Sequence, residues 1–205
     1  MNVLIIYASH FGQTAKIAST IADGLRENGA HVDTFAAGTA QTLPAPSAYD
    51  VVVLGSRIEM GKSASHVVDY VRKYRSTLQR MPTAFFSVSM AAASKPASAD
   101  PQGYMGRMFG KLAWHPDLTA AFAGGLPYRR YGRVLRFIMK WISQTGGQTT
   151  DTSQDHELTD WDAVRKFSDE VFSRFSHEDI NAIPMRGGSP CRYADADDRL
   201  VGLTD

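Results

Sequence analysis

An alternation of short apolar runs with segments of helical periodicity constrains the fold of this chain more than any other feature. Val3–Ala8 is apolar throughout, as in a strand that is buried on both faces of a parallel sheet. Apolar residues then recur at helical spacing over Thr14–Asn28, where Asn-Gly forms a natural stop. The pattern repeats, with strands predicted at 31–35, 50–55, 83–88 and 118–124 and helices around 67–78, 104–113 and 161–175. It predicts an α/β fold, a doubly wound five-stranded parallel sheet with right-handed crossovers.

Charge is unevenly distributed along the 205 residues. The whole chain has a formal net charge of +1. The segment 103–142 alone holds seven basic residues and one acidic residue, which leaves −5 for the remainder. Segregated charge of this kind predicts an anionic partner for the basic segment. Nucleic acid is not expected, because the basic residues are local and no DNA- or RNA-binding motif accompanies them.

Cysteine content and apolar run length bear on the cellular compartment. The single cysteine, Cys191, excludes an intrachain disulfide and a cysteine-based metal site, and so fits a reducing compartment. The histidines show no metal-ligand spacing, so no metal is expected. The first apolar run begins at Asn2 or Val3, which leaves no room for a signal peptide. No apolar run approaches the roughly 20 residues of a spanning helix. We therefore expect a cytoplasmic protein that touches a membrane at most from outside.

Small or hydroxyl residues follow four of the five predicted strands. They are Ser9, Gly55-Ser56, Ser87 with Ser89, and Gly124-Gly125. In a doubly wound sheet, ligands bind outside the carboxyl ends of the strands, where small residues allow close approach. This edge of the sheet is therefore the predicted site.

The loop between the first predicted strand and the first predicted helix is rich in hydroxyl side chains. Backbone N–H groups at a helix start lack helical partners and carry partial positive charge, so such a loop suits a phosphate. Ser9 and Thr14 supply hydroxyl donors, and Gly12 lets the backbone curl around the anion. The loop has neither the lysine of a Walker loop nor three spaced glycines, so a single monoester phosphate is expected. A capping turn with no ligand is the alternative.

This loop resembles the phosphate loop of the flavodoxin-like family, whose form is Ser/Thr-x-x-Gly-x-Thr. The resemblance implies a flavodoxin-like fold that binds FMN, with the phosphate in this loop and the ring between two further loops. By position those loops are 56–61 and 87–91. The cofactor-binding residues that the resemblance implies are Ser9, His10, Phe11, Gly12, Gln13, Thr14, Ser56, Arg57, Ile58, Glu59, Met60, Gly61, Ser87, Val88, Ser89, Met90 and Ala91.

Longer stretches are similar to the menaquinone-dependent protoporphyrinogen IX dehydrogenases, FMN enzymes of haem biosynthesis. They are MPTAFFSVSM, FAGGLPYRRY, FIMKWIS and GGQTTDT followed by TDW. The similarity covers residues 1–175, including a long insertion at about 128–159 before the last helix, and leaves a polar tail at 176–205. It implies dehydrogenation of protoporphyrinogen IX to protoporphyrin IX with a membrane quinone, menaquinone or ubiquinone, as acceptor. Because the flavin carries the redox chemistry, no catalytic acid or base is expected.

The insertion has an amphipathic pattern. From Tyr131 to Ile142 apolar residues fall at helical spacing, while basic residues occupy the other face. This pattern favours a helix on an anionic membrane surface, at the inner face of the cell membrane. An ordinary helix packed on the domain is the alternative. The same basic residues also suit the propionates of a porphyrin. The candidate substrate or membrane contacts are Arg129, Arg130, Arg133, Arg136 and Lys140.

Two other functions remain open at this stage. One is a flavodoxin-like NAD(P)H:quinone reductase, which rapid reduction by NADPH would reveal. The other is a flavodoxin that carries electrons without catalysis. Such carriers are strongly acidic, and the basic insertion argues against that function. Assembly into a homo-oligomer is also left open.

Overall fold

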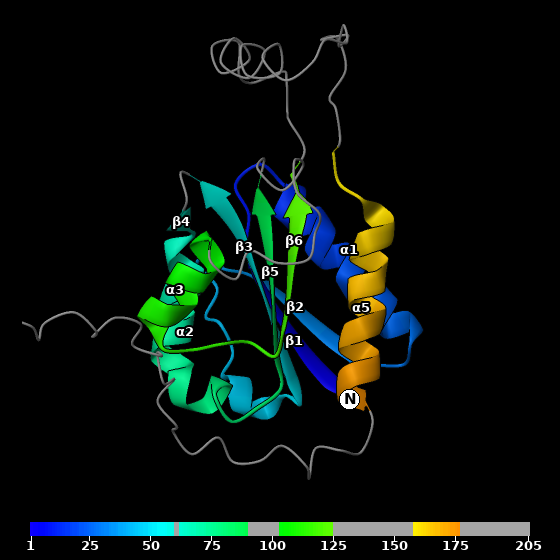
Figure 1. Ribbon diagram of the computed structural model, residues 1–205. Helices are drawn as coiled ribbons and strands as arrows, with labels where there is room; N and C mark the ends of the chain where they lie inside the picture. Colours follow the sequence, from blue (N-terminus) through cyan, green and yellow to red (C-terminus); the bar gives the residue numbers. More distant parts are fainter. Residues whose placement is uncertain (60–61, 90–102, 125–157, 177–205) are drawn as a thin grey trace, which may run out of the picture.

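The computed structural model describes residues 1–59, 62–89, 103–124 and 158–176, which form a parallel sheet with helices on both faces (Figure 1). Five strands lie in the order β2-β1-β3-β5-β6 and pair in parallel. A short sixth strand, which the sequence did not predict, pairs antiparallel with β3. The strands are β1 (Asn2–Ala8), β2 (His31–Ala36), β3 (Val51–Glu59), β4 (Lys62–Ser63), β5 (Thr83–Ser89) and β6 (Leu118–Ala123). The predicted doubly wound α/β fold is confirmed.

Two pairs of helices cover the sheet, as Figure 1 shows. Helices α1 and α5 pack on one face, and α2 and α3 pack on the other. Their bounds are α1 (Gln13–Glu27), α2 (Ser65–Leu78), α3 (Tyr104–Leu112) and α5 (Trp161–Ser176), with a short 3-10 helix, η1 (Pro46–Ala48), before β3. The helices α1, α2, α3 and α5 each begin and end within a few residues of their predicted positions, whereas η1 was not predicted.

Strand β1 lies inside the sheet, between β2 and β3, and this position accounts for its apolar sequence. Val3 and Ile5 pack into the cluster beneath α1 and α5. Leu4 and Ile6 pack into the cluster beneath α2 and α3. All four side chains are fully buried. Helices cover both faces of the sheet, so neither face of the strand is in contact with water and both carry apolar side chains.

Helices α1 and α5 approach each other closely at Gly24. A Cβ atom placed on Gly24 would collide with the hydroxyl of Ser168 on α5. The Ser168 hydroxyl donates a 2.7 Å hydrogen bond to the backbone carbonyl of Arg165, so it is satisfied within its own helix. A residue without a side chain is therefore needed at position 24 for this packing distance.

Strands β3 and β5 are longer than the sequence predicted. β3 was expected to end at Gly55 but continues to Glu59, where Ile58 pairs with Ser63 of β4. β5 runs to Ser89 instead of ending at Val88. Residues 56–59 and Ser89, which were expected beyond the ends of the strands, therefore lie in strands. Small hydroxyl side chains are accommodated in a strand when the fold supplies their hydrogen bonds.

Some predictions fall outside the described residues. They include the insertion from 128 to 157 and the tail from 177 onward, so the division of the chain into a domain, an insertion and a tail stays a prediction. Within the described ranges, none of the helices has both the length and the apolar composition needed to cross a bilayer.

Candidate functional site

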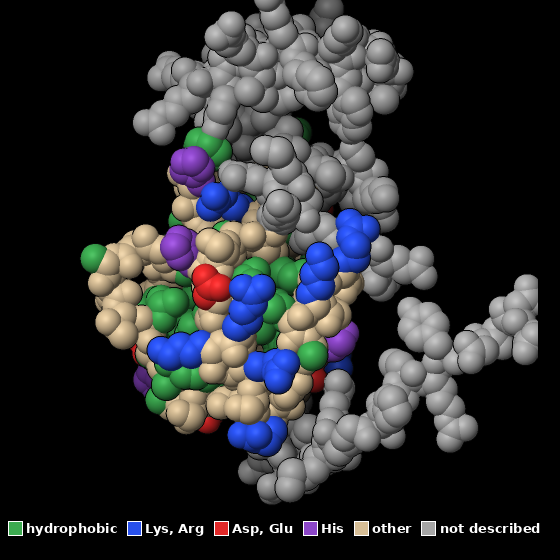
Figure 2. Space-filling view, turned by 90° about the vertical axis from the view of Figure 1, so that its left-hand side faces the viewer, with side chains coloured by type: hydrophobic (Ala, Val, Ile, Leu, Met, Phe, Trp, Pro, Cys, Tyr) green, Lys and Arg blue, Asp and Glu red, His purple; other side chains and the backbone are tan. Residues whose placement is uncertain are grey.

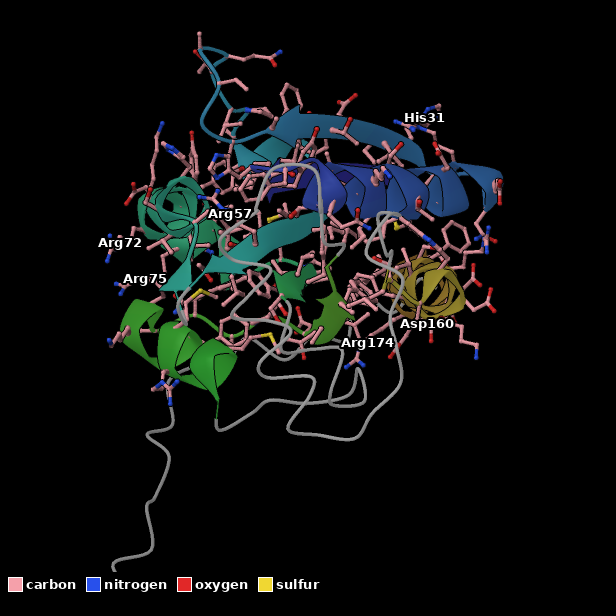
Figure 3. The ribbon with its side chains drawn as sticks, turned by 90° about the horizontal axis from the view of Figure 1, so that it is seen from above. His31, Arg57, Arg72, Arg75, Asp160 and Arg174 are labelled. Carbon is pink, nitrogen blue, oxygen red and sulfur yellow. The ribbon has the colours of Figure 1, made fainter. Side chains whose placement is uncertain are left out.

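The three segments expected to hold a cofactor lie on neighbouring strands at one edge of the sheet. We call this the carboxyl edge, where β1, β3, β5 and β6 end. At this edge the pairing register places Ala8 opposite Ser56 and Ser56 opposite Ser87, so the three residues lie side by side on neighbouring strands. Figure 3 views the molecule from above this edge and labels Arg57 on β3. The topology thus brings together residues that are up to 80 positions apart in the sequence.

The loop from Ser9 to Thr14 turns the chain from β1 into the start of α1. Gly12 has φ +92°, a left-handed conformation that glycine adopts without steric cost. Its N–H donates a 3.1 Å hydrogen bond to the Ser9 hydroxyl, and its carbonyl accepts the first helical bond, from Lys16, at 3.0 Å. The first turn of α1 contains no acidic side chain. Nothing in that turn therefore opposes a negatively charged ligand at the helix N-terminus.

Two aromatic side chains project from this loop. The rings of His10 and Phe11 stack with centroids 4.2 Å apart. Both residues are exposed, Phe11 by 43%. The pair adds a flat aromatic surface beside this loop.

The serines at the ends of β3 and β5 are engaged within the fold. Ser56 is fully buried, and its hydroxyl accepts a 3.0 Å hydrogen bond from the N–H of Ala64, at the start of α2. Ser87 is also fully buried, and its hydroxyl donates to the carbonyl of Ala120 on β6 at 3.4 Å. These two side chains shape the carboxyl edge through internal hydrogen bonds.

Thr159 is a residue of this edge that sequence reasoning did not assign to the site. Its hydroxyl accepts a 2.7 Å hydrogen bond from the side-chain amide of Gln13 and donates a 2.9 Å bond to the carbonyl of Ala123. Gln13 opens α1, whereas Ala123 ends β6. The stretch TDW had drawn notice only as a similarity, and no local spacing links residues 146 positions apart.

Several predicted site residues lie outside the described part of the chain. Of Glu59 only the backbone, in β3, is described. The positions not described are Met60, Gly61, Met90, Ala91, Arg129, Arg130, Arg133, Arg136 and Lys140. Their roles stay predictions.

Trp114 belongs to the hydrophobic core beneath α2 and α3. The side chain is fully buried and packs edge-to-face on Phe85 and Phe109. It precedes β6, at the end of the sheet opposite the carboxyl edge. Within the described ranges, no three His, Cys, Asp or Glu side chains are grouped closely enough to hold a metal ion.

A basic groove lies between α2 and α3, away from the carboxyl edge. It has a volume of about 480 Å³ and is lined by Arg72, Lys73, Arg75, Ser76, Lys111 and Leu112. These residues fall in the second half of α2 and at the end of α3, both far from the ends of the strands. Figure 2 shows the basic side chains spread over this face of the molecule.

Comparison with known proteins agrees with this geometry. A family model described as a flavodoxin domain matches residues 4–153. Among solved structures, an archaeal flavodoxin superposes with a TM-score of 0.51 at 13% identity and covers 86% of this chain and 100% of that chain. Flavodoxin 2 from Bacillus cereus gives 0.52 at 15% identity, over 85% of this chain and 100% of that one. At these identities the likeness concerns the fold alone.

The chain therefore belongs to the flavodoxin domain family. Two curated relatives in sequence carry a more specific name, protoporphyrinogen IX dehydrogenase (quinone). The protein from Escherichia coli K12 is 36% identical over 173 residues, which are 83% of this chain and 94% of the relative. The protein from Leishmania major is 32% identical over 169 residues, 80% of this chain and 72% of the relative.

Proposed function

We propose that this protein is an FMN-dependent oxidoreductase of haem biosynthesis, which oxidises protoporphyrinogen IX to protoporphyrin IX. The porphyrinogen loses six electrons and six protons, so three molecules of a membrane quinone, menaquinone or ubiquinone, are each reduced to the quinol. The observation that carries the proposal is the 36% identity to a relative of that name over 94% of its length. The anion-binding loop at the carboxyl edge, with its left-handed Gly12, supports it independently.

The described residues fit a flavin monophosphate. Under this proposal the start of α1 and the hydroxyls of Ser9 and Thr14 hold the phosphate, since they offer N–H and O–H donors with no competing carboxylate. Gly12 supplies the left-handed turn into α1, and the space beside it is open, since nothing lies within 4 Å of a Cβ atom placed there. The segments 56–61 and 87–91 flank the isoalloxazine ring. Bound FMN supplies the redox chemistry, and the protein supplies binding, orientation and electrostatics.

The carboxyl edge also suits an apolar substrate. Among the described residues, the strongly exposed large hydrophobic side chains are Phe11 and Leu158. Phe11 lies in the phosphate loop, and Leu158 precedes Thr159, which bonds to the end of β6. A porphyrinogen or a quinone ring needs apolar surface of this kind beside the flavin.

The basic insertion extends the proposal to the membrane and to the substrate propionates. Arg129, Arg130, Arg133, Arg136 and Lys140 are the residues proposed for these contacts. Because the quinone resides in lipid, the enzyme has to reach a bilayer surface, and we place it peripherally at the inner face of the cell membrane. Residues 1–175 form the FMN domain in this proposal, and 176–205 form a separate tail.

An anaerobic turnover assay tests the function. Protein reconstituted with FMN is given protoporphyrinogen IX and a menaquinone analogue, and porphyrin fluorescence is followed with and without quinone. Growth of fluorescence that requires quinone supports the dehydrogenase. If FMN is bound and fluorescence does not grow, the haem-pathway function is wrong. A parallel cuvette with NADPH then tests the quinone reductase, which would show rapid bleaching of the flavin.

A further inference from the structure

One hydroxyl group joins three segments that are far apart in the sequence. The Thr159 hydroxyl accepts from the Gln13 side-chain amide at 2.7 Å and donates to the Ala123 carbonyl at 2.9 Å. Gln13 is the first residue of α1, directly after Gly12 of the phosphate loop. Ala123 is the last residue of β6, and Thr159 lies two residues before α5.

The directions of the two hydrogen bonds are fixed by chemistry. The Ala123 carbonyl can only accept, so the single hydrogen of the Thr159 hydroxyl points to it. A lone pair of the same oxygen is thereby turned toward the Gln13 amide, which donates. Thr159 is 8% exposed, so water competes little for these groups and the short chain of bonds is stronger than it would be at the surface.

The Gln13 end of this hydrogen-bonded chain lies beside the proposed phosphate loop. Gln13 follows the residue with φ +92° that turns the chain into α1. A shift of its side chain toward or away from β6 moves the first turn of α1, and with it the N–H groups that the loop offers to an anion. Ala123 precedes segment 125–157 in the sequence and Thr159 follows it. The hydroxyl therefore also joins the described residues before and after that segment.

We propose that Thr159 is a positioning residue for the phosphate loop, which acts through Gln13 to hold the first turn of α1 in its anion-binding arrangement. This inference rests on the proposed FMN site and adds to it a residue from a distant part of the sequence. Thr159 touches neither the flavin nor the substrate in this role. Its effect is specific for the phosphate, because only the phosphate is held by the helix start.

Comparison of FMN with riboflavin separates this role from a general structural one. Riboflavin carries the same ring and lacks the phosphate. Thr159→Val keeps the shape of the side chain and removes its hydroxyl, so it should raise the Kd of FMN about five- to tenfold, the effect of one lost hydrogen bond. The Kd of riboflavin should stay within about twofold. Thr159→Ser restores the hydroxyl and should restore FMN affinity.

Two further variants complete the design. Thr119→Val makes the same chemical change at an exposed position of β6 and should alter neither Kd. Gln13→Leu removes the other partner, so the double variant with Thr159→Val should bind FMN no more weakly than the weaker single variant. Gln13 also serves as the test if Thr159→Val does not fold, because Gln13 lies at a partly exposed position.

The outcomes are distinct. Equal FMN affinity in the wild type and Thr159→Val, additive effects in the double variant, or an equal loss for riboflavin would each overturn the positioning role, while the proposed function stands. A wild-type protein that binds no FMN would overturn the proposed function and this inference with it. A selective, non-additive loss for FMN that Thr159→Ser reverses would support the inference.

Discussion

The side-chain amide of Gln13 lies 2.7 Å from the hydroxyl of Thr159, although 146 positions separate the two residues. The topology of the sheet explains the contact. β1 and β6 are parallel, so both end at the carboxyl edge, and α1 and α5 both begin there and pack on the same face. A ligand at the start of α1 would therefore lie close to the region where the chain enters α5.

Thr14 tests the phosphate site most directly. Thr14→Ala should weaken FMN binding by roughly 1.5–3 kcal/mol, because it removes a hydrogen bond to a charged acceptor. Thr14 is 2% exposed, so the change also leaves a small void. Thr14→Ser keeps the hydroxyl and loses only the methyl group, so it controls for that void and should bind FMN more tightly than Thr14→Ala. Thr20→Ala, within α1, should leave FMN affinity unchanged, since the Thr20 hydroxyl bonds to the Lys16 carbonyl. Flavin fluorescence titration gives the Kd values. Unchanged affinity in Thr14→Ala would contradict the phosphate-loop assignment.

Gly12 should be sensitive through its backbone alone. Nothing lies within 4 Å of a Cβ atom placed there, but its φ is +92°. Gly12→Ala should therefore lower the free energy of unfolding by about 1–2 kcal/mol, and Gly12→Asn should cost less, because asparagine tolerates this conformation. Gly110→Ala is the matched control, since Gly110 lies within α3 with open space around it. That change should stabilise the protein by up to about 1 kcal/mol. Urea denaturation gives the free energy of unfolding of the three variants. If Gly110→Ala also destabilises the protein, the loss in Gly12→Ala cannot be assigned to the backbone conformation of Gly12.

Much of this fold could be predicted because local patterns determine it. Apolar runs such as 3–6 read as buried strands, since helices cover both faces of the sheet. The turn from β1 into α1 at Ser9–Thr14 was also predictable, because Gly12 and the neighbouring hydroxyl residues favour a turn at a helix start. Phosphate binding by this loop stays a prediction.

Other features depend on contacts that no local pattern records. Ser56 and Ser87 resemble loop residues, yet partners on neighbouring elements hold their hydroxyls inside the fold. The role of Thr159 arises from a bond to a residue 146 positions away. β4 exists only because β3 extends far enough to pair with it. These features follow from the assembled sheet.

The contact between α1 and α5 makes Gly24 intolerant of a side chain. Gly24→Ala should lower the free energy of unfolding by roughly 1–3 kcal/mol, because the new methyl group meets the Ser168 side chain and forces the helices apart. Ser168→Gly removes that side chain, so the double variant should recover part of the loss relative to the sum of the single changes. Urea denaturation of the four proteins gives the coupling energy. Strictly additive effects would show that the two positions do not meet.

A test of the membrane proposal needs a control variant that loses the same number of positive charges at another place on the protein. Replacement of Arg133, Arg136 and Lys140 by Gln should leave FMN binding intact and reduce co-sedimentation with anionic vesicles, because each basic residue near the surface contributes about 1 kcal/mol. The control replaces Arg72, Lys73 and Arg75, which line the groove between α2 and α3, and it should pellet like the wild type. If both triple variants lose binding equally, net charge alone explains the attraction. If the insertion variant still pellets fully, the membrane role of the insertion is wrong.

Tyr70 should make the protein less stable at high pH. Burial raises the pKa of Tyr70 well above its usual value of 10.0, and its hydroxyl donates a 2.9 Å hydrogen bond to the Pro44 carbonyl. Above about pH 10 the unfolded chain releases this proton while the folded protein keeps it, so the free energy of unfolding falls as pH rises. The slope contributed by this group approaches about 1.4 kcal/mol per pH unit.

Tyr70→Phe isolates that contribution. The variant should be less stable than the wild type at pH 8, because the Pro44 carbonyl loses its donor, by about 1 kcal/mol. Between pH 10 and 11.5 its stability should decline less steeply than that of the wild type, since it has no proton to lose at this position. Part of the decline should remain, because burial and the Asp33 carboxylate also raise the pKa of Tyr49. Urea denaturation at several pH values compares the slopes, and parallel curves would show that the Tyr70 proton does not contribute.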